Sequence, residues 1–135
     1  MNLIPARISH LLIEEHVGNQ LVFLEEISGT RRFSIAIGAL EAMALQRALT
    51  REEFARPLTH DLFLNALQAF DIVPREVRIV SMQQETFFAE IVLHQETAEA
   101  SVETALDCRP SDALALAARS NLKILVNEEL FAALG

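Results

Sequence analysis

Residues 31–49 read Arg-Arg-Phe-Ser-Ile-Ala-Ile-Gly-Ala-Leu-Glu-Ala-Met-Ala-Leu-Gln-Arg-Ala-Leu, and the periodicity of this stretch changes at Gly38. Before the glycine, apolar and polar side chains alternate as in a strand, with one apolar face formed by Phe33, Ile35 and Ile37. After the glycine, nearly every residue favours a helix, and apolar side chains recur at helical spacing at Leu40, Met43, Ala44 and Leu45. The stretch therefore predicts a strand followed directly by a helix.

The same two patterns alternate along the rest of the chain. Before residue 31 the sequence predicts two further strands, at 6–14 and 21–27, and turns at Gly18-Asn19 and at residues 28–30. Together with the strand before Gly38 they form a meander. After residue 49 we expect helices at 59–70, 111–119 and 128–134, and strands at 77–82, 86–93, 101–106 and 123–126. The second helix has its apolar stripe at Leu62, Phe63, Ala66, Leu67 and Phe70, and Asn127 caps the last helix. Hairpins separated by helices favour an α+β fold, a single compact domain over residues 1–135 with mostly antiparallel strands and about four helices.

Composition narrows the range of functions. The hydrophobic fraction of 51% and the charged fraction of 22% are those of a globular protein. The formal net charge of −8 argues against a protein that binds nucleic acid through a broadly basic surface. Ten of the eleven cationic residues are arginine, which suits phosphate, carboxylate and buried ion pairs equally well. No glycine-rich phosphate loop follows any predicted strand, so the common nucleotide-binding folds are not expected.

The chain also carries cues about its cellular compartment. The first residues lack the basic and apolar regions of a signal peptide, and the apolar runs are much shorter than the ~20 residues of a membrane span. Cys108 is the one cysteine, so no intramolecular disulfide can form, and we expect it to behave as a small apolar side chain. These features predict a cytoplasmic protein without a membrane segment.

A first polar motif lies at residues 56–61, Arg-Pro-Leu-Thr-His-Asp. Proline is favourable at a helix start, and Thr59 or Asp61 is suited to cap the free backbone N–H groups there. Capping explains neither Arg56 nor His60, which makes both candidates for phosphate binding and acid–base chemistry. Adjacent residues on a helix point about 100° apart, so His60 and Asp61 are not expected to form a direct pair. A hydrogen-bonded structural histidine is the alternative reading of His60.

A second polar motif lies at residues 107–112, Asp-Cys-Arg-Pro-Ser-Asp. Pro110 again opens a helix, and Arg109 together with the helix N-terminus would attract a phosphate. Asp107 and Asp112 are candidate ligands of Mg²⁺ or Mn²⁺, which prefer oxygen donors. Asp107 and Arg109 would share a face of an extended segment, so a contact between them is plausible. The alternative is a capped helix with a structural Arg–Asp pair.

Glu41 is a third candidate because it is a carboxylate within the otherwise apolar residues 39–45. Its place in the first helical turn has a simple explanation in the helix dipole. A carboxylate on an apolar face also calls for a cationic partner, which Arg56 or Arg109 would supply. Glu41 is therefore a third candidate ligand of a metal ion.

Three segments resemble the bifunctional nuclease (DUF151) domain family, in the order in which they occur here. They are residues 35–42 (Ile-Ala-Ile-Gly-Ala-Leu-Glu-Ala), 56–62 (Arg-Pro-Leu-Thr-His-Asp-Leu) and 107–117 (Asp-Cys-Arg-Pro-Ser-Asp-Ala-Leu-Ala-Leu-Ala), and residues 87–90 also resemble a strand of the family. The resemblance extends over nearly the whole chain, from about residue 8 to about residue 130. It implies a compact α+β domain that forms homo-oligomers, and a nuclease that cuts RNA and DNA.

The resemblance supplies no residue-level roles, so these follow from chemistry at the matching positions. We expect His60 to act as general acid or base, and Arg56 and Arg109 to bind the scissile phosphate. Asp61 would either orient His60 or complete the shell of a metal ion. Asp112 and Asp107, with Glu41 as a speculative third ligand, would hold Mg²⁺ or Mn²⁺. Two alternatives remain open: a non-catalytic oligomeric assembly module held by the same Arg/Asp groups, and a sensor of small anionic ligands.

Overall fold

The computed structural model describes residues 1–14 and 19–135, so the turn predicted at Gly18-Asn19 lies partly outside the described residues. The strands are β1 Leu3–Leu12, β2 Gln20–Glu26, β3 Arg32–Ile37, β4 Ile72–Gln83, β5 Thr86–Glu96, β6 Ser101–Cys108 and β7 Lys123–Asn127. The helices are α1 Ala39–Leu49, α2 Thr59–Ala69, α3 Pro110–Ser120 and α4 Glu128–Leu134. The predicted order of strands and helices is therefore confirmed.

All seven strands of the described chain belong to one sheet, in the order β3-β2-β1-β7-β4-β5-β6. The first three strands form the predicted antiparallel meander, and β4, β5 and β6 form a second one. The two meanders join through β7, which runs antiparallel to β1 and parallel to β4. The fold is thus α+β with a mostly antiparallel sheet, as expected.

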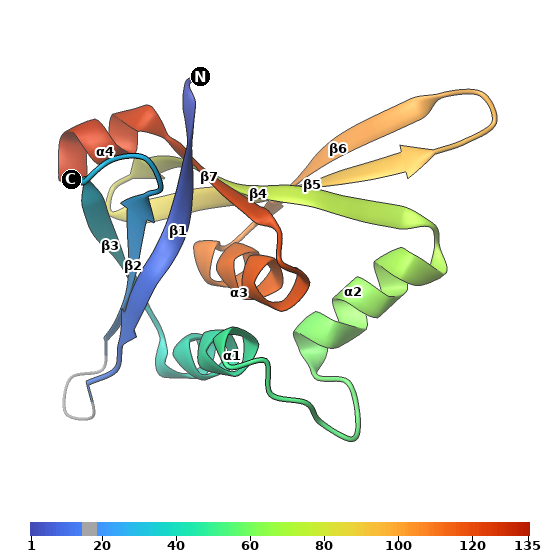
Figure 1. Ribbon diagram of the computed structural model, residues 1–135, viewed down its shortest axis with the longest axis horizontal. Coiled ribbons are helices and arrows are strands. Elements are labelled where there is room, and N and C mark those ends of the chain that lie inside the picture. Colours follow the sequence, from blue (N-terminus) through green and yellow to red (C-terminus); the bar gives the residue numbers. More distant parts are fainter. Residues whose placement is uncertain (15–18) are drawn as a thin grey trace.

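The helices α1, α2 and α3 lie together on one side of the sheet (Figure 1). The sheet is curled. Phe33 on β3 and Phe87 on β5 stack with ring centroids 5.8 Å apart, although β3 and β5 are far apart in the sheet order. The buried ring of Phe131 from α4 meets Phe33 edge-on at 5.2 Å. This aromatic group joins the start of β3 to β5 and to α4.

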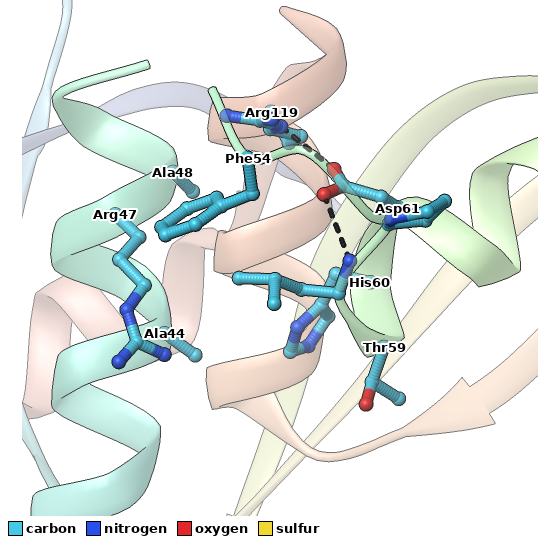
Figure 2. A pocket seen from close by; sticks show the side chains of 10 residues that line it. Ala44, Arg47, Ala48, Phe54, Thr59, His60, Asp61 and Arg119 are labelled. Carbon is cyan, nitrogen blue, oxygen red and sulfur yellow. Dashed lines mark hydrogen bonds and ion pairs between the residues drawn. The ribbon is translucent and has the colours of Figure 1, made fainter. Parts of the chain in front are cut away.

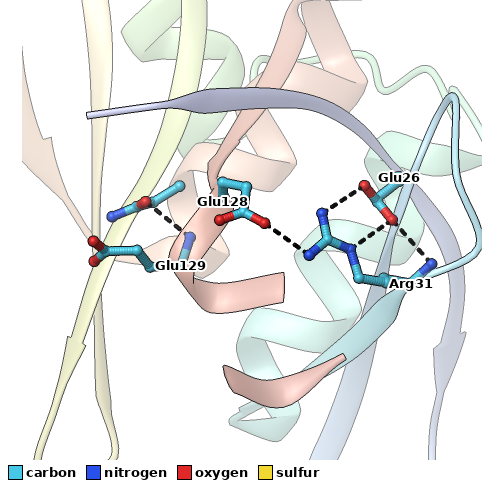
Figure 3. A network of polar contacts seen from close by, with 5 residues as sticks. Glu26, Arg31, Glu128 and Glu129 are labelled. Carbon is cyan, nitrogen blue, oxygen red and sulfur yellow. Dashed lines mark hydrogen bonds and ion pairs between the residues drawn. The ribbon is translucent and has the colours of Figure 1, made fainter. Parts of the chain in front are cut away.

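An ion-pair network fastens α4 to the turn between β2 and β3 (Figure 3). The Arg31 guanidinium donates to Glu26 at 2.9 Å and to Glu128, the first residue of α4, at 2.8 Å. The hydrogen bond from Arg31 lowers the pKa of the Glu26 carboxyl. At the same helix start, the Asn127 side chain accepts the backbone N–H of Glu129 at 3.1 Å, so the predicted cap is confirmed.

The apolar stripe predicted for α1 is wrong in part. Leu45 is buried as expected, but Leu40 is 75% exposed and Met43 is 45% exposed. The face that packs against α3 consists of Leu45 with Ala42 and Ala48. Because nearly every position of α1 is apolar, its sequence is compatible with more than one buried face, and the small alanines allow the closer approach of α3.

The stripe predicted for α2 also differs from the structure. Leu67 is buried, whereas Leu62 is 61% exposed and Phe70 is 72% exposed. The helix sits at the margin of the molecule, against α3 and the start of β4, so much of its apolar face meets solvent (Figure 1). This loose attachment matters for the site, because α2 carries His60.

Several strands run further than their sequence patterns predicted, among them β5, which continues to Glu96. β4 begins at Ile72 and passes through Pro74, where the pairing with β5 shifts register before Glu76. Proline is tolerated in strands at such irregularities, since it lacks the N–H of a regular ladder. β6 extends to Cys108, which carries the chain directly to the start of α3.

The helices of the described chain are short, with 11 residues or fewer in each. Within residues 1–14 and 19–135, none of the helices combines the length and the apolar character that a crossing would require.

Candidate functional site

The first turns of α1, α2 and α3 converge on one place. Glu41 is the third residue of α1, His60 the second of α2 and Asp112 the third of α3. All three line a small cavity together with Arg109, the residue that precedes α3. We refer to Glu41, His60, Arg109 and Asp112 as the helix-start cluster.

Asp112 is the centre of the helix-start cluster. Its Oδ2 accepts a hydrogen bond from Nε of Arg109 at 2.9 Å, and its Oδ1 accepts one from Nη2 at 3.2 Å. The same Oδ1 lies 3.1 Å from Nε2 of His60, which is 52 residues away in the chain. Nη1 of Arg109 reaches Glu41 Oε2 at 3.5 Å. The expectation that an arginine pairs with Glu41 is thereby confirmed for Arg109.

The surroundings of Asp112 determine its charge. Burial opposes ionisation, but the hydrogen bonds from Arg109 and His60 outweigh burial, so the pKa of the Asp112 carboxyl is lower than usual. An ionised carboxylate only accepts hydrogen bonds, so the His60 nitrogen that faces it, Nε2, is the one that carries the proton. In the neutral ring the lone pair then belongs to Nδ1, which is the arrangement of a base oriented by an acid.

Gly38 allows Glu41 to take its position. Gly38 precedes α1 with an ordinary extended backbone. A Cβ atom built on it would overlap Oε1 of Glu41. The absence of a side chain at this position thus lets the Glu41 carboxylate fold back over the helix start, where it meets Arg109.

Three adjoining cavities surround the helix-start cluster. The small one, of about 80 Å³, is lined by all four cluster residues. On one side it shares Ala44 and His60 with a cavity of about 390 Å³ between α1 and α2 (Figure 2). On the other side it shares Glu41, Arg109 and Asp112 with an open cavity of about 680 Å³ that reaches β5 and β6. Larger cavities thus adjoin the cluster on two sides.

The other predicted site residues lie outside the cluster. Asp61 pairs with Arg119 of α3 at 2.7 Å and accepts the backbone N–H of Leu58 at 3.3 Å, so it caps α2 as expected and does not contact His60. Arg56 is exposed in the loop before α2 and lines none of the three cavities. The structure thus gives Asp61 a structural contact and leaves Arg56 at the surface.

The predicted contact between Asp107 and Arg109 is wrong. Asp107 is exposed on β6, in register with Glu90, at the edge of the largest of the three cavities. Arg109 precedes Pro110 with an extended backbone, and its side chain turns toward the first turn of α3. The Arg109 guanidinium thus contacts Asp112 and Glu41, and within the described chain it does not contact Asp107.

The acids of this region do not form a metal centre in the described chain. Among residues 1–14 and 19–135, no group of three or more His, Cys, Asp or Glu side chains is placed to hold a metal ion. Both oxygens of Asp112 already accept from Arg109, whose guanidinium lies between Asp112 and Glu41. The cation that balances these two acids is thus an arginine, and Asp107, Asp112 and Glu41 in this arrangement do not fit a shared divalent ion.

Cys108 lies beside the cluster without the properties of a nucleophile. Burial, together with the nearby acids Asp112, Asp107 and Glu90, raises the pKa of its thiol to about 11. At neutral pH the side chain is therefore a neutral thiol. This agrees with its prediction as a small, partly buried apolar group.

The sequence patterns missed three residues around the 390 Å³ cavity. Arg119 holds Asp61 and also donates to the backbone carbonyl of Glu52 at 2.7 Å. Arg47 lies over the ring of Phe54, with its guanidinium carbon 5.8 Å from the ring centroid. In the sequence, each arginine is simply a cation in the last turn of a helix, and Phe54 is an isolated apolar residue in a polar loop.

Comparison with known proteins identifies the family to which the chain is similar. The family model described as the bifunctional nuclease domain matches residues 22–135. An uncharacterized protein of Mycobacterium tuberculosis is 33% identical over 129 residues, which cover 96% of this chain and 74% of that protein. Bifunctional nuclease 1 and bifunctional nuclease 2 of Arabidopsis thaliana are each 29% identical over 96 residues, which cover 71% of this chain and 29% of the plant proteins.

Proposed function

We propose that this chain, which belongs to the bifunctional nuclease domain family, hydrolyses phosphodiester bonds of RNA or DNA at the helix-start cluster. The observation that carries the proposal is the contact between His60 and Asp112, beside Arg109 and within a connected set of cavities. A histidine oriented by a carboxylate, next to an arginine, combines a proton acceptor with an anion-binding group. Two plant relatives named nucleases support the same chemistry.

His60 acts as the general base in this proposal. Its Nδ1 removes a proton from a water molecule, while Asp112 holds the ring through Nε2 and stabilises the imidazolium that forms. The water oxygen forms a new bond to phosphorus, the bond from phosphorus to the leaving oxygen breaks, and solvent protonates that oxygen. Because water is the nucleophile, the step does not need a 2′-hydroxyl and applies to RNA and DNA alike.

Arg109 binds the phosphate and balances the charge that develops on it. The guanidinium has five N–H donors, and its contacts with Asp112 and Glu41 use at most three of them. The Arg109 side chain is 63% exposed at the cavity surface, so the remaining donors are accessible to a phosphate. Arg56 contributes a more distant positive charge in the loop before α2.

The expected role of Mg²⁺ or Mn²⁺ stays a prediction. Divalent ions bound by carboxylates supply Lewis-acid stabilisation in many nucleases. Since Arg109 occupies the space between Glu41 and Asp112, we assign no step to such an ion. Assays with each ion and with EDTA decide whether the ion is needed.

A homo-oligomeric assembly module is the second candidate function. Leu40, Met43 and Leu62 are large apolar side chains exposed on α1 and α2, as at many subunit interfaces. In that case the ion pairs of the helix-start cluster would stabilise the fold and would not bind a substrate. We place the protein in the cytoplasm under either function.

Cleavage of labelled single-stranded RNA and DNA tests the nuclease proposal. Wild type, His60→Gln and the control His10→Gln are purified identically and assayed with Mg²⁺, with Mn²⁺ and with EDTA. His10 is exposed on β1 and lines none of the three cavities at the cluster. His10→Gln therefore makes the same chemical change as His60→Gln, but away from the site. Loss of a general base is expected to slow cleavage by about 10²–10⁴-fold in His60→Gln alone.

The pattern across the three proteins separates the possible outcomes. Equal cleavage by all three would mean that the activity belongs to a contaminant. Absence of cleavage in every condition, with folded protein, would favour the assembly module.

A further inference from the structure

We infer that the 390 Å³ cavity between α1 and α2 is a nucleobase-binding subsite, so that the helix-start cluster receives an unpaired nucleotide. The identification of the nucleotide as a substrate rests on the proposed nuclease function. The binding of a base in this cavity does not depend on it, because the cavity has its own recognition chemistry.

The volume and lining of the cavity suit a small, partly polar ligand. Its volume lies within the range of about 300–1,000 Å³ that is usual for sites of small ligands. Apolar walls come from Ala44, Ala48 and Leu58, and polar groups come from Arg47 and His60. A nucleobase has the matching combination of two apolar faces and a polar edge.

Phe54 supplies an aromatic surface in this cavity. The residue is 39% exposed, in a loop that is otherwise polar. Its ring lies among the residues that line the cavity (Figure 2). Stacking of a base on such a ring is favourable for every base, since all of them present a π face.

Arg47 is an unusual arginine in this chain. Four arginines of the described residues are half-buried: Arg31, Arg47, Arg78 and Arg119. Three of these pair with carboxylates, whereas Arg47 has no carboxylate within 4.0 Å among the described residues. Its guanidinium lies over the Phe54 ring and lines the cavity. An arginine held in this way is suited to donate to a base edge or to a phosphate.

The cavity opens onto the helix-start cluster through His60. His60 and Ala44 line both the 390 Å³ cavity, which we call the base cavity, and the small cavity lined by Arg109 and Asp112. In Figure 2 the guanidinium of Arg47 and the ring of His60 point to the same end of the cavity. A base stacked on Phe54 would thus place its own phosphate beside His60 and Arg109.

This arrangement selects for unpaired nucleotides. A base that stacks on Phe54 has left its neighbours in the strand and its partner in a duplex. Removing a base from a duplex costs a few kcal/mol, and a single strand avoids most of this cost. The subsite therefore predicts that single strands are bound and cut in preference to duplexes, with little preference for sequence.

A titration followed by NMR tests the subsite without relying on cleavage. Adenosine 5′-monophosphate and ribose 5-phosphate are each added to the full chain, as wild type, Phe54→Leu and the control Phe70→Leu. Phe70 follows α2, is 72% exposed and lines neither the base cavity nor the cluster. Leucine keeps most of the apolar volume and removes the π face, so only stacking is lost.

We expect wild type to bind the nucleotide about tenfold more tightly than ribose 5-phosphate. Phe54→Leu should lose most of this difference, and Phe70→Leu should retain it. Equal affinity of wild type for the two ligands, or an unchanged affinity in Phe54→Leu, would overturn the subsite.

Cleavage assays on the same variants separate the two proposals. Phe54-dependent nucleotide binding without any cleavage would retain the subsite and remove the nuclease function. Cleavage of a single-stranded oligonucleotide with the same KM in wild type and Phe54→Leu would retain the nuclease function and remove the subsite.

Discussion

At the scale of single residues, Asp112 links the stability of the site to its chemistry. The carboxylate joins α3 to His60 of α2 and, through Arg109, to Glu41 of α1. Its side chain is 30% exposed, so its contacts are partly shielded from water. The same interactions that keep this group ionised therefore hold three helix starts together.

The lowered pKa of Asp112 makes its contribution to stability dependent on pH. A carboxyl whose pKa is lower in the folded than in the unfolded protein stabilises the folded state. This stabilisation is complete at pH values above the ordinary pKa of 3.8, and it disappears as the pH falls through the pKa of the folded state. We expect Asp112→Asn to reduce the free energy of unfolding by about 1 kcal/mol at pH 7. The difference from wild type should shrink as the pH is lowered below about 4.

Urea unfolding at pH 7, 5, 4 and 3 measures this difference. Asp107→Asn serves as the control, because the exposed Asp107 forms no ion pair among the described residues. It should change the unfolding free energy little at any pH. A constant difference between wild type and Asp112→Asn down to pH 3 would contradict the role given to Asp112.

At the scale of elements, polar contacts at its N-terminus help to hold α2 in place. One residue of α2, Leu67, is buried. The ion pair between Asp61 and Arg119 joins the start of α2 to the end of α3, and both side chains are about one-fifth exposed. Arg119 also holds the loop before α2 through the carbonyl of Glu52. These contacts fix the helix that presents His60.

A double-mutant cycle on Asp61 and Arg119 tests this link. We expect Asp61→Asn and Arg119→Gln each to lower the unfolding free energy by about 1–3 kcal/mol, with a coupling energy of about 1 kcal/mol. The control cycle uses the Arg7–Glu25 pair, where Arg7 is 62% exposed, and its coupling should be clearly smaller, near the lower end of the range of about 0–1 kcal/mol for exposed pairs. Equal coupling in the two cycles would mean that the Asp61–Arg119 pair does not secure α2.

At the scale of the whole molecule, the net charge of −8 shapes any encounter with nucleic acid. Long-range attraction does not bring the two together, so binding depends on a few local contacts with phosphate. The helix-start cluster and the base cavity together offer Arg109 and Arg47 for such contacts. The affinity of the chain for nucleic acid should therefore depend less on salt concentration than that of a basic nucleic-acid-binding protein.

The salt dependence of binding to a single-stranded oligonucleotide measures the number of phosphate contacts. With one or two contacts, raising monovalent salt from about 50 to about 200 mM should weaken binding by about three- to sevenfold. Arg109→Gln should reduce this dependence, while Arg7→Gln, on the exposed part of β1, should leave it unchanged. A loss of a hundredfold or more in wild type would point to a much larger basic interface than the structure contains.

The local patterns of the sequence predicted most of the elements and some of the site. The alternation before Gly38, the helix formers after it, Pro110 at a helix start and Asn127 as a cap all correspond to observed features. They are predictable because backbone sterics and capping hydrogen bonds act between residues a few positions apart. The candidates Glu41, His60, Arg109 and Asp112 came from the same helix starts.

Only the tertiary structure decided which side chains meet. His60 and Asp112 are 52 residues apart, and their contact requires the start of α2 to pack against α3. Likewise, Arg109 turns to Asp112 and Glu41 and not to Asp107, and α1 buries Ala42 while Leu40 faces solvent. A sequence pattern specifies what each segment prefers, whereas these contacts depend on how separate segments exclude water from a shared core.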